Sequence, residues 1–368
     1  MNILLTSHRF SPDIGGTEMV TELLAEEFSK AGHTTVVVTQ TTGRARLPTT
    51  HLAAAGSRLH PGVGTFSKLR RAVAGEGGPS GRITYQVIRR PNMTTLLQLY
   101  RWCDVVLQNQ IGLQTAWPLI FVRRPWVIAH HNWVDVQRGL LGCLKRLALR
   151  LARNVAASQA LADRLPVPAK VVPNPYRKEV FKAAANGSRQ KDLIFVGRLI
   201  RGKGVHVLIE ALRELDHRGY RRELTIVGDG PTLTELRRAA EGLSVEFVGA
   251  RRNGELSDLL ADHRILVVPS VDPEPFGIVA IEGLACGCVV VATRNAGLVE
   301  AVSTHGVLCK PGDPQSLANA ILEADAASRP IDGVAQHLAR HDPEYVANEY
   351  LKVLAAAIAD NSRRTRQS

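Results

Sequence analysis

The sequence has few cysteines, few aromatic residues and no long hydrophobic segment. Five cysteines in 368 residues are too sparse for a disulfide framework, so we expect reduced thiols. No apolar run approaches the ~18–20 residues that a membrane-spanning helix needs. The first residues, Met1 to Thr6, are typical of a strand and lack the basic segment and cleavage site of a signal peptide. We therefore expect a cytoplasmic protein.

Several motifs are also missing or incomplete. No complete Gly-x-Gly-x-x-Gly follows the first strand, which argues against a nicotinamide-dependent dehydrogenase. The segment from Gly197 to Lys203 comes within one residue of a P-loop, but Gly204 stands where that motif has the magnesium-binding Ser or Thr. Cys286 and Cys288 have no second pair or histidine cluster beside them, which favours small buried residues over a metal site. A P-loop nucleotide hydrolase is therefore a weaker alternative.

Positive charge is in excess, and the excess lies in the first half of the chain. The formal net charge is +12, and residues 1–174 carry 21 Lys and Arg against 9 Asp and Glu. Residues 175–368 carry 25 basic and 25 acidic residues. This asymmetry suits an anionic membrane surface or an anionic acceptor, but a solvated basic surface without a partner explains it equally well. Nucleic acid is not expected, because no aromatic residues are interleaved with the basic ones.

Strand-like and helix-like segments alternate along both halves of the chain. This predicts an α/β protein with two Rossmann-like, doubly wound parallel sheets that face each other across a crevice. We assign residues 1–174 to an N-terminal domain, 175–345 to a C-terminal domain, and 346–368 to a terminal helix with a disordered basic tail. Residues 41–82, rich in Gly, Pro, Ser and Arg, are predicted to be a mobile basic insertion.

The element predictions follow from apolar spacing and turn residues. The predicted strands are 2–7, 34–40, 83–88, 104–108, 126–130, 155–158, 192–196, 224–227, 245–248, 265–268, 289–292 and 307–309. The predicted helices are 17–31, 93–101, 112–122, 138–152, 204–217, 231–242, 254–262, 277–286, 314–327 and 343–359.

The strongest motif is a pair of glutamates, Glu274 and Glu282, with seven residues between them. The apolar run before them predicts a buried strand, and a helical pattern follows. Glu274 is therefore expected in the strand-to-helix turn, and Glu282 about two turns further on near the same face. Gly277 lets backbone N–H groups at the helix start point at an anion. Two carboxylates beside such a helix start suit a ligand with hydroxyls and phosphates, such as a nucleotide-sugar.

Two cations are predicted at another strand-to-helix turn. Arg198 and Lys203 follow the strand that ends at Gly197, and both can converge on the helix that begins near Gly204. The N–H groups and dipole of a helix start already favour anions. Two cations there suit a diphosphate that gains charge as it leaves, although a cationic turn without a ligand has the same pattern.

Two weaker signals lie in the first half. Gly15 and Gly16 precede the first helix and allow a phosphate or sugar to approach the backbone closely, although turn chemistry alone also explains them. His130 and His131 follow a strand and are expected at the crevice, where either could bind a sugar hydroxyl or orient an acceptor.

Together these residues resemble glycosyltransferase family 4, the retaining nucleotide-sugar transferases of the GT-B fold. The resemblance covers nearly the whole chain apart from 41–82 and the tail, and the two glutamates with the upstream Arg198 and Lys203 are its most specific part. Weaker elements are Gly15-Gly16, His131, Pro173-Asn174, Gly228-Asp229-Gly230-Pro231 and Phe247-Val248-Gly249. The chain departs from the family with Pro175 in the hinge and with Asn132 after the doubled histidine.

The resemblance implies a role for each motif. Arg198 and Lys203 would hold the donor diphosphate, Glu282 would accept hydrogen bonds from the ribose, and Glu274 would lie beside the donor sugar. Further contacts are implied for the backbone of Phe276, Gly277 and Ile278 at the sugar, the backbone near Val248 at the base, Gly15 and Gly16 under the diphosphate, and His131 near sugar and acceptor.

These implications predict a retaining glycosyltransferase that moves a sugar from a UDP- or GDP-sugar to a hydroxyl of a glycan, lipid-linked or small-molecule acceptor. The product would serve glycan, exopolysaccharide or glycolipid synthesis. No Asp-x-Asp pair occurs in the chain, so we expect no metal, with Arg198 and Lys203 in its place. The protein would be cytoplasmic, resting on the inner membrane face by its basic half. A nucleotide-sugar epimerase of the same fold is the main alternative.

Overall fold

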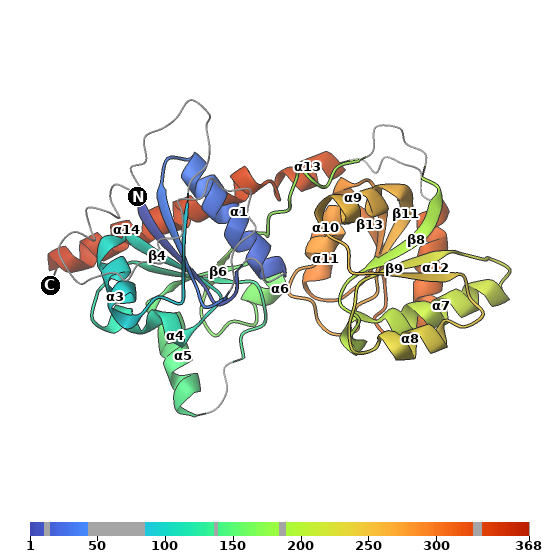
Figure 1. The fold of residues 1–368 in the computed structure, drawn as a ribbon, viewed down its shortest axis with the longest axis horizontal. Coiled ribbons are helices and arrows are strands. Elements are labelled where there is room, and N and C mark those ends of the chain that lie inside the picture. Colours follow the sequence, from blue (N-terminus) through green and yellow to red (C-terminus); the bar gives the residue numbers. More distant parts are fainter. Residues whose placement is uncertain (11–14, 43–84, 136–138, 184–188, 327–332, 368) are drawn as a thin grey trace.

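In the computed structural model the chain forms two α/β lobes that lie side by side (Figure 1). The structure describes residues 1–10, 15–42, 85–135, 139–183, 189–326 and 333–367. Each lobe is built on a parallel sheet whose central strands are largely buried, because helices cover both faces. The predicted fold class is thereby confirmed. The predicted insertion at 41–82 lies, from residue 43 onward, outside the described residues.

The first lobe has a seven-stranded sheet of order β3-β2-β1-β4-β5-β6-β7. Its strands are β1 (Asn2–Ser7), β2 (Thr34–Thr39), β3 (Gln86–Arg89), β4 (Val105–Asn109), β5 (Trp126–His130), β6 (Arg153–Ala156) and β7 (Ala169–Val171). Its helices are α1 (Gly16–Lys30), α3 (Met93–Trp102), α4 (Leu113–Ala116), the 3-10 helix η1 (Trp117–Ile120), α5 (Leu140–Leu151) and α6 (Gln159–Ala162). The strand order reverses between β1 and β4, which is where such sheets bind ligands.

The second lobe has a six-stranded sheet of order β10-β9-β8-β11-β12-β13. Its strands are β8 (Lys191–Val196), β9 (Leu224–Val227), β10 (Val245–Gly249), β11 (His263–Val268), β12 (Val289–Thr293) and β13 (Gly306–Cys309). Its helices are η2 (Arg201–Lys203), α7 (Val205–His217), α8 (Leu233–Ala239), α9 (Asn253–Asp262), α10 (Ile278–Ala285), α11 (Gly297–Val302), α12 (Pro314–Ala326) and α13 (Val334–Ala339). Here the order reverses between β8 and β11.

The last helix, α14 (Pro343–Gln367), leaves the second lobe and packs on the first (Figure 1). Val346, Tyr350 and Leu354 form a stripe of spacing four and are buried in the same core as α1 and β1. The chain therefore crosses between the lobes twice. The helix continues to Gln367, where the sequence pattern predicted a disordered tail.

Most differences from the predicted elements concern short segments. The predicted helix 112–122 is divided into α4 and η1, and Pro118 lies at the start of the 3-10 turn. β7, α6, α11 and α13 were not predicted, since three to six residues are too few to show a period. None of the helices in the described ranges has both the length and the apolar composition needed to cross a bilayer.

Candidate active site

The predicted phosphate-binding turn lies at the carboxyl edge of the second sheet, where three loops pack backbone against backbone. A Cβ atom on Gly228 would overlap the carbonyl oxygen of Gly197, and one on Gly204 would overlap that of Pro269. Gly204 also has φ +72°, a conformation that L side chains rarely adopt. Glycine is therefore required at position 204 by its surroundings, and the Ser or Thr of a P-loop cannot stand there.

Lys203 and Glu274 form an ion pair between the two predicted turns. The same carboxyl oxygen, Oε1 of Glu274, also accepts a hydrogen bond of 2.7 Å from Ser270 Oγ. Both side chains remain partly accessible, so a ligand can reach the pair from the crevice. A phosphate that bound Lys203 would replace the Glu274 carboxylate as its counter-ion.

Hydrogen-bond donors without an acceptor lie close to Lys203 and Glu274 in the chain. Arg198 is exposed just after β8, and its guanidinium makes no hydrogen bond or ion pair with any described residue. The backbone N–H groups of Phe276, Gly277 and Ile278, at the start of α10, likewise donate to nothing in the described ranges. Gly277 has φ +110°, which opens the helix start. Free N–H groups at a helix start favour an anion or a hydroxyl oxygen.

Glu282 lies on α10, one turn inside the helix. It is partly buried, and its carboxyl group has no hydrogen bond or ion pair among the described residues. Burial raises the pKa of this carboxyl from its ordinary value to about 8, although the nearby guanidinium of Arg177 acts in the opposite direction. A carboxyl group without a partner in such a place is suited to exchange hydrogen bonds with ligand hydroxyls.

A framework that the sequence did not reveal holds the Glu274 turn. Asn295 Nδ2 donates to the carbonyl oxygens of Ser270, Val271 and Asp272 at 3.2, 3.0 and 2.9 Å. Thr293 Oγ1 donates to the Ser270 oxygen at 2.7 Å. The sequence does contain Asn-Ala-Gly at 295–297, residues typical of a turn, just after a buried strand.

Val248 occupies an irregularity in β10. The pairing with β9 shifts between Phe247 and Gly249, so that Val248 is left out of the ladder. Gly249 retains its carbonyl bond to the N–H of Gly228, at 3.0 Å. The backbone of Val248 is therefore available to a ligand at the edge of the sheet.

The first lobe meets this site at the start of α1. A Cβ atom on Gly16 would lie 3.0 Å from Cδ1 of Ile278, so the starts of α1 and α10 face each other. Gly15 is in an extended conformation that any residue adopts, with φ −179°, so its backbone does not demand glycine. The carboxylate of Glu18, in the first turn of α1, lies over Gly15 instead.

The two histidines have different hydrogen-bond partners. His130 Nε2 lies 3.0 Å from Oδ1 of Asn154 on the neighbouring strand β6. His131 Nδ1 donates to Asn174 Oδ1 in the hinge at 2.7 Å, and its Nε2 is buried without a partner. Burial lowers the pKa of His131 to about 4, so the ring is neutral and Nε2 is an acceptor. Asn174 also accepts a hydrogen bond from His341 Nδ1 at its carbonyl oxygen, at 2.9 Å.

Direct contacts between the lobes fix the segment around Glu274. Trp133 Nε1 donates to the carbonyl oxygen of Pro273 at 2.8 Å, and Ser158 Oγ donates to that of Pro275 at 2.6 Å. The Glu300 carboxylate accepts hydrogen bonds from the N–H groups of Gln159 and Ala160, at the start of α6. The carboxylate predicted to lie beside the reacting sugar is therefore positioned by both lobes.

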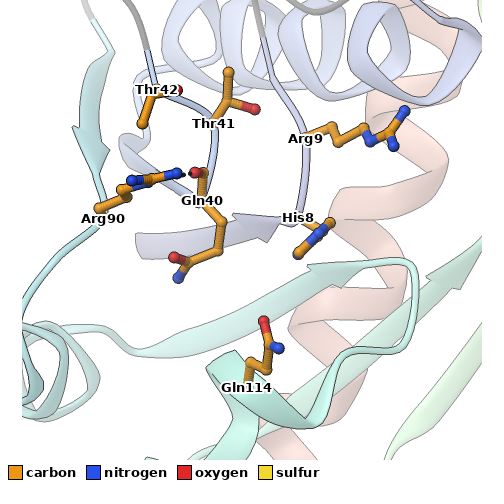
Figure 2. Close-up of a pocket in the computed structure, with 7 residues that line it drawn as sticks. All are labelled: His8, Arg9, Gln40, Thr41, Thr42, Arg90 and Gln114. Atoms are coloured by element: carbon orange, nitrogen blue, oxygen red, sulfur yellow. Dashed lines mark hydrogen bonds between the residues drawn. The ribbon is translucent and has the colours of Figure 1, made fainter.

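A cavity of about 550 Å³ opens at the carboxyl edge of the first sheet. It is lined by residues that follow β1, β2 and β3, and by one residue of α4, which follows β4. In Figure 2, Gln114 reaches toward it from one side and Gln40 from the other, with His8 beside them. Its lining residues are His8, Arg9, Gln40, Thr41, Thr42, Arg90 and Gln114, with no acidic side chain among them.

Arg90 is held at this cavity by its backbone. The residue has φ +44°, its N–H donates to the carbonyl oxygen of Thr39 at 2.8 Å, and its Nε donates to that of Gln40 at 3.1 Å (Figure 2). A positive φ is costly for a residue with a side chain and persists where the surroundings enforce it. Among the described residues, no group of three or more His, Cys, Asp or Glu is arranged to hold a metal ion.

Comparison with solved structures decides the fold. The structure of Anabaena Alr3699/HepE in complex with UDP and glucose superposes with a TM-score of 0.71 at 21% identity, over 96% of this chain and 99% of that one. WaaG, a glycosyltransferase involved in lipopolysaccharide biosynthesis, gives 0.59 at 17%, over 96% and 99%. The chain has the GT-B fold.

Within this GT-B chain, residues 190–325 match the family model of glycosyl transferases group 1. The D-inositol 3-phosphate glycosyltransferase of Corynebacterium jeikeium is 39% identical over 146 residues, 36% of this chain and 35% of that protein. The GDP-mannose-dependent alpha-(1-6)-phosphatidylinositol dimannoside mannosyltransferase of Mycobacterium tuberculosis is 33% identical over 130 residues, 35% and 34%. These matches span only about a third of the curated relatives' length.

Proposed function

We propose that the protein is a retaining, metal-independent glycosyltransferase that moves a sugar from a nucleotide-diphosphate sugar to a hydroxyl acceptor. The observation that carries the proposal is the ion pair of Lys203 and Glu274, with the unpartnered Arg198 and the free N–H groups of the α10 start near it in the chain. This set offers cations for a diphosphate and a carboxylate for sugar hydroxyls.

Binding of the donor would rearrange the ion pair. The diphosphate takes Lys203 and Arg198 as counter-ions, and Glu274, released from Lys203, accepts hydrogen bonds from the donor sugar. As the sugar leaves, negative charge grows on the diphosphate, and two fixed cations stabilise that charge without a metal. The partly buried Glu282 accepts hydrogen bonds from the ribose, and the unpaired backbone of Val248 contacts the base.

The comparisons support a UDP- or GDP-sugar donor. One structural neighbour was solved with UDP and glucose, and one relative is named for GDP-mannose. The acceptor would lie in the cavity of His8, Gln40, Arg90 and Gln114, whose amides suit hydroxyls and whose guanidinium suits an acidic group. A lipid-linked, glycan or small-molecule acceptor in glycan, exopolysaccharide or glycolipid synthesis fits this chemistry. His131 Nε2, a neutral acceptor, would receive a sugar hydroxyl.

The experiment is a pair of lysine substitutions in the same strand-and-turn unit. Lys203→Ala removes the cation at the carboxyl edge of β8, whereas Lys191→Ala removes a partly exposed one, paired with Glu246, at the opposite end of that strand. We expect Lys203→Ala to lower donor turnover about 10²–10³-fold and Lys191→Ala to leave it unchanged. If Lys203→Ala turned over the donor at the wild-type rate, the proposal would be wrong.

Two controls separate the alternatives. Conversion of a UDP-sugar without any acceptor would indicate an epimerase instead. Magnesium-dependent ATP hydrolysis would indicate a nucleotide hydrolase, although the overlap that any side chain at Gly204 would have with Pro269 argues against that class. Turnover that persists in a chelating agent is expected of the proposed enzyme.

A further inference from the structure

Helix α5 presents an apolar face to solvent. Four leucines lie along it at intervals of four, three and four residues. Their exposed fractions are 76% for Leu140, 42% for Leu144, 52% for Leu147 and 65% for Leu151. Residues at this spacing share one side of a helix. We call this set the leucine stripe.

The opposite side of α5 is the one that packs on the lobe. Leu149 is fully buried, and Gly142 and Ala148 are buried with it. The outward side of a helix that packs this way is normally polar. Contiguous apolar surface of this kind on a folded chain marks a contact with a partner or a membrane.

The charge along this stretch of the chain is of one sign. Residues 136–162 contain five Lys and Arg and no Asp or Glu. Arg150 is exposed at the edge of the leucine stripe and has no ion pair among the described residues. Lys145 Nζ donates to the carbonyl oxygen of Asp135 at 3.0 Å.

This charge selects one kind of occupant. A second copy of the chain placed on the stripe would bring like charges together, which opposes association. Apolar side chains that enter the acyl region while cations meet headgroups are the chemistry of an interfacial helix on anionic lipid. The helix lies at the lower edge of the first lobe in Figure 1, away from the second lobe, so a flat surface can reach it.

We propose that the leucine stripe of α5 seats the protein on an anionic phospholipid surface. The helix lies in the plane of the interface, with the four leucines toward the acyl chains and Arg150 toward the headgroups. The chain enters α5 soon after the loop that holds His131 and Trp133, so the first lobe would present the crevice to a substrate held at that surface.

The test is cosedimentation with vesicles. Wild type is compared on phosphatidylcholine alone and on equal amounts of phosphatidylcholine and phosphatidylglycerol. We expect at least about tenfold tighter binding to the anionic vesicles, weakening with salt. The triple change Leu144→Ser, Leu147→Ser, Leu151→Ser should weaken that binding about tenfold or more, and Arg150→Glu should weaken it by a smaller factor. Tyr220→Ser and Arg238→Glu, exposed positions of the second lobe, are the matched controls and should bind like wild type.

Three outcomes would overturn this inference. The triple variant could bind the vesicles like wild type, or wild type could bind neutral and anionic vesicles equally or not at all. Alternatively, sedimentation velocity could show a wild-type dimer that the triple variant dissociates in the absence of vesicles, which would make the stripe an interface between copies. UDP binding by the triple variant, measured in solution, checks that it is folded and keeps this result separate from the proposed enzymatic function.

Discussion

Replacing Glu282 with Gln should stabilise the protein and weaken its hold on the nucleotide. The carboxyl of Glu282 is partly buried and unpartnered, and its pKa is raised from 4.5 to about 8. Each tenfold change in proton affinity corresponds to about 1.4 kcal/mol, so the full shift corresponds to at most about 5 kcal/mol. Because the side chain keeps some contact with solvent, we expect about 2 kcal/mol near pH 8.

The sign follows from proton linkage. A carboxyl whose pKa is higher in the folded than in the unfolded protein binds its proton more tightly when folded. Its contribution to stability is fully present below pH 4.5 and is lost as the pH rises toward 8. Gln does not titrate, so the advantage of Glu282→Gln should be close to zero near pH 4.5 and should grow steadily up to pH 8.

The assay is urea unfolding of wild type and Glu282→Gln at several pH values between 4.5 and 8. Glu241→Gln, at an exposed position of the same lobe, is the control and should match wild type at every pH. UDP binding at pH 8 should fall in Glu282→Gln, because Gln offers the ribose hydroxyls only one oxygen. Equal unfolding free energies of wild type and Glu282→Gln at pH 4.5 and at pH 8 would refute the raised pKa of the Glu282 carboxyl.

Two further predictions concern the framework and the acceptor side. Asn295→Ala removes three hydrogen bonds to the carbonyls before Glu274, so urea unfolding should show a loss of about 1–3 kcal/mol, with a lower kcat. Asn319→Ala, on α12, is its control, and an unchanged kcat in Asn295→Ala would contradict a positioning role. Arg90→Gln should raise the KM for acidic acceptors about tenfold and leave UDP binding intact. An identical effect on neutral acceptors would exclude a charge contact.

Local patterns were enough to predict the elements that carry the donor site. The apolar run before Glu274, the glycine at position 277 and the helical spacing after it correctly predicted a strand, a turn and a helix, since these depend on neighbours in the chain. The strand before Arg198 was predicted on the same ground. Short elements such as α6 were not predicted, because four residues are too few to show a helical period.

Contacts between distant segments could not be predicted in this way. The bond of Trp133 to the Pro273 carbonyl joins residues 140 positions apart, and no local pattern encodes it. The exposure of the α5 leucines could not be predicted either. Their spacing predicts an apolar face but not whether another element covers that face. Only the packing of Leu149 inward shows that the stripe points outward.

By itself, the sequence determined the fold class, the order of the lobes and the residue types at the donor turns, because period, glycine and charge act over a few residues. The tertiary structure decided which of those residues meet. It paired Lys203 with Glu274, left the side chains of Arg198 and Glu282 without partners, and brought the start of α1 against the start of α10. These outcomes depend on how two sheets and the returning α14 pack together, and packing is a property of the whole chain.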